Sequence, residues 1–312
     1  MKRSIIAIVG LLVMSMVFTA CLTESGPAAG GRADDNRPAY DREGFAITLP
    51  DEINTIVSIG PSNTEILVEL GFGDFVIATD FFSGNVPGIA PDISVLDMMA
   101  LDAEFIIDLH PCVIFITGMT RAPGADDPLW LVSAAGISVI YLPTSASIAD
   151  IMEDIRFIAA VMEANAAGEA IIADMQAELD IIAEIAAGIS GTRTVYFEIS
   201  PAPWMFSFGS GTFLHEMLAL VGAINIFADE EGWMGLSDEV LLVANPDVIL
   251  TSTDFIDDPI GEIMGRPGWD VITAVQNADV FMIDADASSR PSHNIIYALW
   301  QMARAIHPAY FE

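Results

Sequence analysis

The chain has 312 residues, of which 53% are hydrophobic, enough for two modest domains with hydrophobic cores. Acidic residues outnumber basic residues 44 to 11, which gives a formal net charge of −33. Such a surface repels nucleic-acid phosphates and anionic lipid headgroups, which argues against nucleic acid as a partner. The same charge suits a protein that stays soluble in strong salt or in an acidic medium.

Residues 1–20 are predicted to form an export signal. Lys2 and Arg3 precede an apolar run, residues 5–18, that is short for a membrane span. The ending Phe18-Thr19-Ala20-Cys21 resembles a bacterial lipobox, with Phe18 less usual than Leu. The resemblance implies cleavage before Cys21 and a lipid on its sulfur; the alternative is an ordinary signal peptide with an incidental cysteine.

Residues 21–44 show no hydrophobic periodicity and are predicted to form a flexible tether. Cys112 is the second of the two cysteines. Because Cys21 is expected to carry a lipid, no disulfide is expected, and Cys112 is interpreted as an inert core residue.

Residues 45–146 are predicted to form a first α/β lobe. Short apolar runs alternate with helical patterns, which favours a parallel sheet covered on both faces. Ser62 and Glu65 match a capping box at the start of the first helix, and Asp102 is a candidate helix cap. The expected strands are 55–59, 75–79, 112–117 and 137–142, and the expected helices are 62–71, 102–109 and 126–136.

Residues 147–188 are predicted to form one long, rigid helix. Ser147 is a good N-cap, Asp150 follows three residues later, and Gly188 supplies a stop. About 40 residues at 1.5 Å each would make a rod of roughly 60 Å, with Gly168 as the place of a bend. A coiled-coil segment is the alternative, but the apolar residues do not keep a strict heptad.

Residues 189–312 are predicted to form a second α/β lobe. The fold class is therefore α/β, with two lobes, each a mainly parallel sheet flanked by helices, joined by the long helix. A crevice between two lobes is where ligands usually bind. The expected strands are 193–199, 247–251 and 279–283, and the expected helices are 211–221, 237–244 and 291–306.

Several local motifs then point to one family. They are VSIGPSNTEIL at residues 57–67 followed by Leu70-Gly71, an L-x-P-x-x-I core at Leu109, Pro111 and Ile114, ANPDVI at 244–249, PGW at 267–269 and AVQNADV at 274–280. In this order, and after a lipobox, they resemble the substrate-binding lipoproteins of bacterial ABC importers for metal chelates: cobalamin, ferric siderophores and haem. The resemblance covers residues 47–308.

The resemblance implies an extracytoplasmic protein, held to the cell membrane by the lipid on Cys21, at the cell surface or in a periplasm. A metal chelate would bind between the lobes, and the long helix would limit hinge motion to a few degrees. The implied partners are an ABC permease and its ATPase. By position, Glu104 and Glu239 match the acidic residues that dock arginine pockets of the permease. A monomer without an intrinsic cofactor is expected.

Aromatic and methionine side chains gather in the connections that should face the crevice. Flat apolar walls suit a planar macrocycle, and methionine adapts to irregular faces. The alternative is that these residues only pack loops onto the core. The candidate ligand contacts of this kind are Phe81, Phe82, Met98, Trp204, Phe206 and Trp233.

Polar candidates lie at the start of the last predicted helix. Arg290 and His293 could hold an anionic or amide group, and His293 could be an axial ligand to cobalt or iron. Arg121 follows the third predicted strand and could reach the same crevice. The alternative for Arg290 and His293 is a helix start with capping side chains.

The few basic residues bear on the ligand. Anionic ferric catecholates or citrates call for several Arg or Lys in a pocket, so a nearly neutral corrinoid ranks first, a ferric siderophore second and haem third. An enzyme is disfavoured, because no nucleophile elbow, Walker loop or dinucleotide fingerprint is present. A bare zinc or manganese site would need converging ligands, for which His215 and His293 with an Asp are the candidates. Loops rich in Trp and Met argue for a larger ligand, so no metal ligand is predicted.

Overall fold

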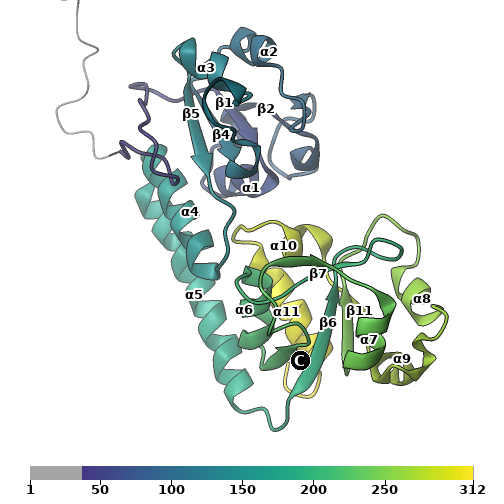
Figure 1. Ribbon diagram of the computed structural model, residues 1–312. Coiled ribbons are helices and arrows are strands. Elements are labelled where there is room, and N and C mark those ends of the chain that lie inside the picture. Colours follow the sequence, from purple (N-terminus) through teal and green to yellow (C-terminus); the bar gives the residue numbers. More distant parts are fainter. Residues whose placement is uncertain (1–36, 312) are drawn as a thin grey trace, which may run out of the picture. The chain divides into compact units, whose positions relative to one another are not determined.

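The computed structural model describes residues 37–311 (Figure 1). The expected signal peptide, the expected lipidation site Cys21 and residues 21–36 of the expected tether lie outside the described residues.

The first lobe is built on a five-stranded parallel sheet with the strand order β3-β2-β1-β4-β5. The central strands β1 and β4 are near-continuous runs of β-branched and aromatic residues, and both are buried on both faces. The four expected strands are confirmed, and the short edge strand β3 adds a fifth. The bounds are β1 Ile56–Ile59, β2 Val76–Asp80, β3 Ser94–Leu96, β4 Val113–Thr117 and β5 Ser138–Leu142.

Three helices accompany this sheet: α1 (Pro61–Glu69), α2 (Ala103–Asp108) and α3 (Trp130–Ala134). The expected cap of α2 is confirmed, because the Asp102 carboxylate accepts the Phe105 N–H at 3.0 Å. The expected capping box of α1 is wrong. Gly60 is the N-cap, and the Glu65 side chain forms hydrogen bonds with the second lobe instead.

The single helix expected over 147–188 is wrong. Two helices, α4 (Ile148–Val161) and α5 (Asn165–Ala187), lie side by side as a hairpin (Figure 1). The chain reverses at Glu163, which has a left-handed φ of 56°. Gly168 is a contact position rather than a bend, because a Cβ there would lie 2.5 Å from the Cβ of Ala159. The expected cap is confirmed, since Ser147 and Asp150 form a capping box at the start of α4.

Because of the hairpin, the two lobes are not connected by the single long helix expected over residues 147–188. Helix α4 packs on α1 of the first lobe, whereas α5 packs on α6 and α11 of the second. The connecting element is therefore α5 alone, which has 23 residues and a length of roughly 35 Å.

The second lobe contains a four-stranded parallel sheet with the order β11-β10-β6-β8 and an antiparallel pair, β7 and β9. The expected strands β6, β10 and β11 are confirmed, whereas the three short strands β7, β8 and β9 were not anticipated. The bounds are β6 Arg193–Glu198, β7 Phe206–Phe208, β8 Ala223–Asn225, β9 Trp233–Gly235, β10 Val248–Thr251 and β11 Val280–Met282.

In the part of the second lobe that the structure describes, there are six α-helices. The helix expected over 291–306 begins only at Ile295, because residues 290–294 form an irregular loop after a separate short helix, α10. The bounds are α6 Phe213–Leu220, α7 Asp238–Ala244, α8 Pro259–Met264, α9 Thr273–Asn277, α10 Ala285–Ser289 and α11 Ile295–Ile306. None of the helices between residues 37 and 311 combines the length and the apolar character that crossing a bilayer requires.

Residues 40–46, here called the strap, pack on the first lobe, so the expected tether does not extend to residue 44. The buried Asp41 carboxylate accepts the backbone N–H groups of Glu43 and Phe45 at 3.0 and 2.8 Å. Arg42 forms an ion pair with Asp154 of α4 at 2.7 Å. Buried charge partners of this kind fix the strap, which composition alone had suggested to be flexible.

Candidate ligand-binding site

A cavity of about 700 Å³ is lined by residues of both lobes. From the first lobe come the turn between β1 and α1 and the residues at or after the carboxyl ends of β4 and β5. From the second lobe come β7, β9, the start of α6 and the loop between α10 and α11. The carboxyl ends of parallel strands are the usual place for ligands in such sheets.

The walls of the cavity are mostly apolar. The structure places three of the predicted aromatic and methionine contacts here: Met98, Phe206 and Trp233. Met119 and Phe213 also line the cavity and were not anticipated. Trp233 is held on β9 opposite Phe208 of β7, and the two rings meet edge to face with centroids 6.0 Å apart. Trp233 remains 44% exposed, so its indole is available to a ligand.

Three other predicted aromatic contacts do not line the cavity. Phe81 and Phe82 follow β2 in a short 3₁₀ turn and contact each other edge to face. Trp204 lies in the turn before β7. The exposed fractions of the three side chains are 74%, 57% and 82%.

Arg121 does not reach the cavity between the lobes. Its guanidinium lies over the Phe45 ring, 3.3 Å from the centroid, and 4.4 Å from the centroid of Tyr141. It also forms an ion pair with Glu43 at 2.9 Å. These residues border a separate hollow of about 640 Å³ on the first lobe. The strap therefore engages Arg121, which is why its expected role in the crevice does not fit.

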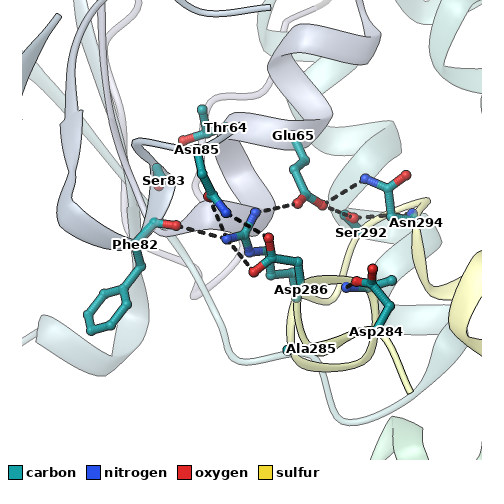
Figure 2. A network of polar contacts seen from close by, with 12 residues as sticks. Thr64, Glu65, Phe82, Ser83, Asn85, Asp284, Ala285, Asp286, Ser292 and Asn294 are labelled. Carbon is teal, nitrogen blue, oxygen red and sulfur yellow. Dashed lines mark hydrogen bonds and ion pairs between the residues drawn. The ribbon is translucent and has the colours of Figure 1, made fainter. Parts of the chain in front are cut away.

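Arg290 does line the cavity, but its donors are engaged within the protein. One guanidinium nitrogen donates to Glu65 of the first lobe at 2.9 Å, and the other pairs with Asp286 at 2.6 Å. Ser292 and Asn294 also donate to Glu65, as Figure 2 shows. We call these five residues with Asn85 the interlobe network.

His293 lies beside this network rather than in the cavity. Its Nε2 is 3.5 Å from the Glu69 carboxylate, and its Nδ1 has no hydrogen-bond partner among residues 37–311. Burial lowers the pKa of His293 below its usual 6.5, although Glu69 and Glu65 act in the opposite direction.

Asp154 is the second charged side chain among the described residues that line the cavity. Its carboxylate pairs with Arg42 and accepts the Ser145 hydroxyl, each at 2.7 Å. Burial raises the pKa of Asp154, although Arg42 and Ser145 act in the opposite direction. Among the described residues that line the cavity, both charged side chains, Asp154 and Arg290, are thus paired inside the protein, which leaves no unpaired positive charge there for a ligand.

The two predicted docking residues are exposed at helix starts. Glu104 lies in the first turn of α2 and Glu239 in the first turn of α7. A hydrogen bond from the Ser237 hydroxyl lowers the pKa of Glu239, so this carboxylate is charged at neutral pH. In the described part of the chain, no three His, Cys, Asp or Glu side chains are grouped to hold a metal ion, so His215 and His293 do not belong to such a group.

Comparison with known proteins agrees with this architecture. Residues 56–287 match the family model described as periplasmic binding protein. An uncharacterized ABC transporter substrate-binding lipoprotein of Bacillus subtilis is 29% identical over 316 residues, covering 97% of this chain and 96% of that protein. A vitamin B12-binding protein of Vibrio cholerae is 26% identical over 258 residues, covering 82% of this chain and 90% of that protein.

A solved structure is also similar. The crystal structure of a possible iron-binding periplasmic protein of Staphylococcus epidermidis matches with a TM-score of 0.72 at 26% identity. The match covers 82% of this chain and 100% of that one. The chain belongs to the periplasmic binding protein family, and it is a substrate-binding protein of an ABC importer rather than an enzyme.

Proposed function

We propose that the protein captures a metal chelate in the cavity between its lobes and delivers it to a permease, with a corrinoid such as cobalamin as the ligand. The observation that carries the proposal is a cavity with apolar, aromatic walls, in which the lining residues between 37 and 311 leave no positive charge unpaired. Flat apolar walls favour a macrocycle, and paired charges favour a ligand that is nearly neutral.

The similarity to a vitamin B12-binding protein supports the same ligand. A cavity of about 700 Å³ suits part of a large chelate, one face of which can remain in solvent. A neutral ferric siderophore is the second candidate, because it meets the same charge condition and because a possible iron-binding protein has the same fold. Haem ranks below both, since its two carboxylates would find no unpaired arginine among the described residues that line the cavity.

Tryptophan fluorescence tests the proposal. Titration with cyanocobalamin should give saturable quenching, and Trp233→Phe should remove most of the signal because Trp233 lines the cavity. Trp204→Phe is the matched control, because Trp204 is exposed outside the cavity. Quenching that survives in the Trp233 variant would place the ligand elsewhere, and no binding of corrinoid, haemin or ferric siderophore would refute the metal-chelate function.

The proposal includes docking of Glu104 and Glu239 on a permease. Both carboxylates are exposed, one on each lobe, so they can pair with two basic sites of the permease that lie the same distance apart. Glu104→Arg and Glu239→Arg should each leave ligand affinity unchanged and abolish stimulation of the reconstituted transporter's ATPase. Asp174→Arg, at an exposed position of α5, is the control for the charge change. Full stimulation by both variants would remove these residues from the docking surface.

The same proposal holds the protein to the outer face of the cell membrane by a lipid on Cys21. The name of the Bacillus subtilis relative, a lipoprotein, supports it. Cell fractionation should then find the wild-type protein with the membranes and the Cys21→Ser variant in the soluble fraction. Membrane association of the variant would contradict the anchor.

A further inference from the structure

Three donors of the second lobe converge on one carboxylate of the first lobe. The Glu65 carboxylate accepts from Arg290 at 2.9 Å, from Asn294 at 3.0 Å and from the Ser292 hydroxyl. All three donors come from the loop between α10 and α11. Figure 2 shows Ser292 and Asn294 directed at the Glu65 carboxylate. Glu65 and Arg290 are each only 6% exposed. Charged and neutral donors around one buried carboxylate make up a carboxylate-binding site, and its occupant is a side chain of the protein itself.

Arg290 is held in place independently of Glu65. Its second terminal nitrogen donates to the Phe82 carbonyl at 3.0 Å and to the Asn85 side-chain oxygen at 2.8 Å, and it pairs with Asp286 at 2.6 Å. The guanidinium therefore keeps three partners when Glu65 is removed, so the charged donor of the site stays in position.

The same arginine borders the ligand cavity. Arg290 lines it together with its neighbours Ser289 and Pro291, whereas Glu65 does not line it. Two carboxylates, those of Glu65 and Asp286, thus compensate the positive charge of Arg290, and Glu65 does so from behind the cavity wall.

We propose that Glu65 is a specificity-determining residue: its carboxylate fills the site formed by Arg290, Ser292 and Asn294, and this makes the cavity select against ligands that carry carboxylates. The inference rests on the proposed function, since it concerns which chelates are admitted. It also assigns a carboxylate-binding site to the interlobe network, one that accepts a free carboxylate when Glu65 is absent.

A small carboxylate tests the site without any chelate. In the purified Glu65→Ala protein, acetate should raise the Tm in a saturable way, beyond its effect on the wild type at matched ionic strength. Glu69→Ala, which removes an exposed carboxylate one turn later on α1, is the control and should behave like the wild type. Equal acetate shifts in all three proteins would overturn the inference and leave Glu65 as a clamp between the lobes.

Ligand preference tests the selectivity. The ratio of the Kd values for cyanocobalamin and haemin should shift toward haemin by roughly tenfold or more in Glu65→Ala, the range expected for one charged hydrogen bond. Glu65→Gln keeps the packing and removes the charge, so the same ratio can be measured with this variant if the alanine variant does not fold. An unchanged ratio in the folded variants would overturn the inference. Failure of the proposed function would show separately, as a wild type that binds no chelate.

Discussion

At the scale of single residues, the pKa of His293 depends on how the second lobe packs against α1 of the first lobe. It lies on the loop before α11 and faces two carboxylates of α1, those of Glu65 and Glu69. Burial disfavours its charged form, and this effect exceeds the attraction of both carboxylates, so its pKa is lowered.

The lowered pKa gives a prediction with a definite sign. As the pH falls, His293 takes up a proton near pH 6.5 in the unfolded chain but only at a lower pH in the folded protein. The unfolded state is therefore favoured in the pH range just below 6.5, and the protein loses stability there. Urea unfolding at pH 7.5 and 5.5 should show a smaller loss for His293→Asn than for the wild type. His110→Asn is the control, because His110 is exposed and its φ of 52° suits asparagine. The same loss in all three proteins would contradict the assignment.

The sequence allowed several site residues to be predicted from the chemistry of their side chains, but it did not allow the interaction partners of these residues to be predicted. Trp233 and Phe206 follow from bulky aromatic side chains in short connections, and both line the cavity. Arg121 and Arg290 were equally sound candidates, yet the structure engages both internally. The partner of Arg290 is 225 residues away in the chain, and Glu65 carries a local signal, a capping box, that points to a different role.

At the scale of elements, the hairpin of α4 and α5 depends on a close approach of the two backbones. Gly168 is buried against Ala159, and Arg156 of α4 pairs with Glu169 of α5 at 2.6 Å. The exposed ion pair contributes little, about 0–1 kcal/mol, so the packing of small residues determines the contact.

Gly168→Ala tests this packing. In an exposed helix the change would stabilise by about 1 kcal/mol, but overpacking costs about 1–3 kcal/mol, so a net loss in the free energy of unfolding is expected. Adding Ala159→Gly should recover part of it, because the new methyl group regains its space. Ala170→Gly, at an exposed position of α5, measures how much the difference in helix propensity between alanine and glycine alone changes the free energy of unfolding. A gain in stability from Gly168→Ala would show that the helices are not in close contact there.

The sequence predicted most elements because alternation, caps and glycines are local signals. The turn between α4 and α5 was missed because Glu163 adopts a left-handed conformation that residues other than glycine rarely adopt, and no glycine or proline marks it. The strap was missed for a similar reason, since Asp41 and Arg42 find their charged partners 80 and 112 residues away.

At the scale of the whole molecule, net charge and cavity chemistry act in the same direction. A formal charge of −33 repels anionic chelates at long range, and the part of the cavity lining that the structure describes offers no unpaired cation at short range. The account therefore makes ligand charge the decisive variable, more than the identity of the metal.

The most direct measurement is calorimetric titration of the protein with cyanocobalamin and with an anionic ferric tricatecholate, each at low and high salt. The account predicts that cyanocobalamin binds at least roughly tenfold more tightly, and that added salt narrows the difference by screening the repulsion. Tighter binding of the anionic chelate at both salt concentrations would contradict it.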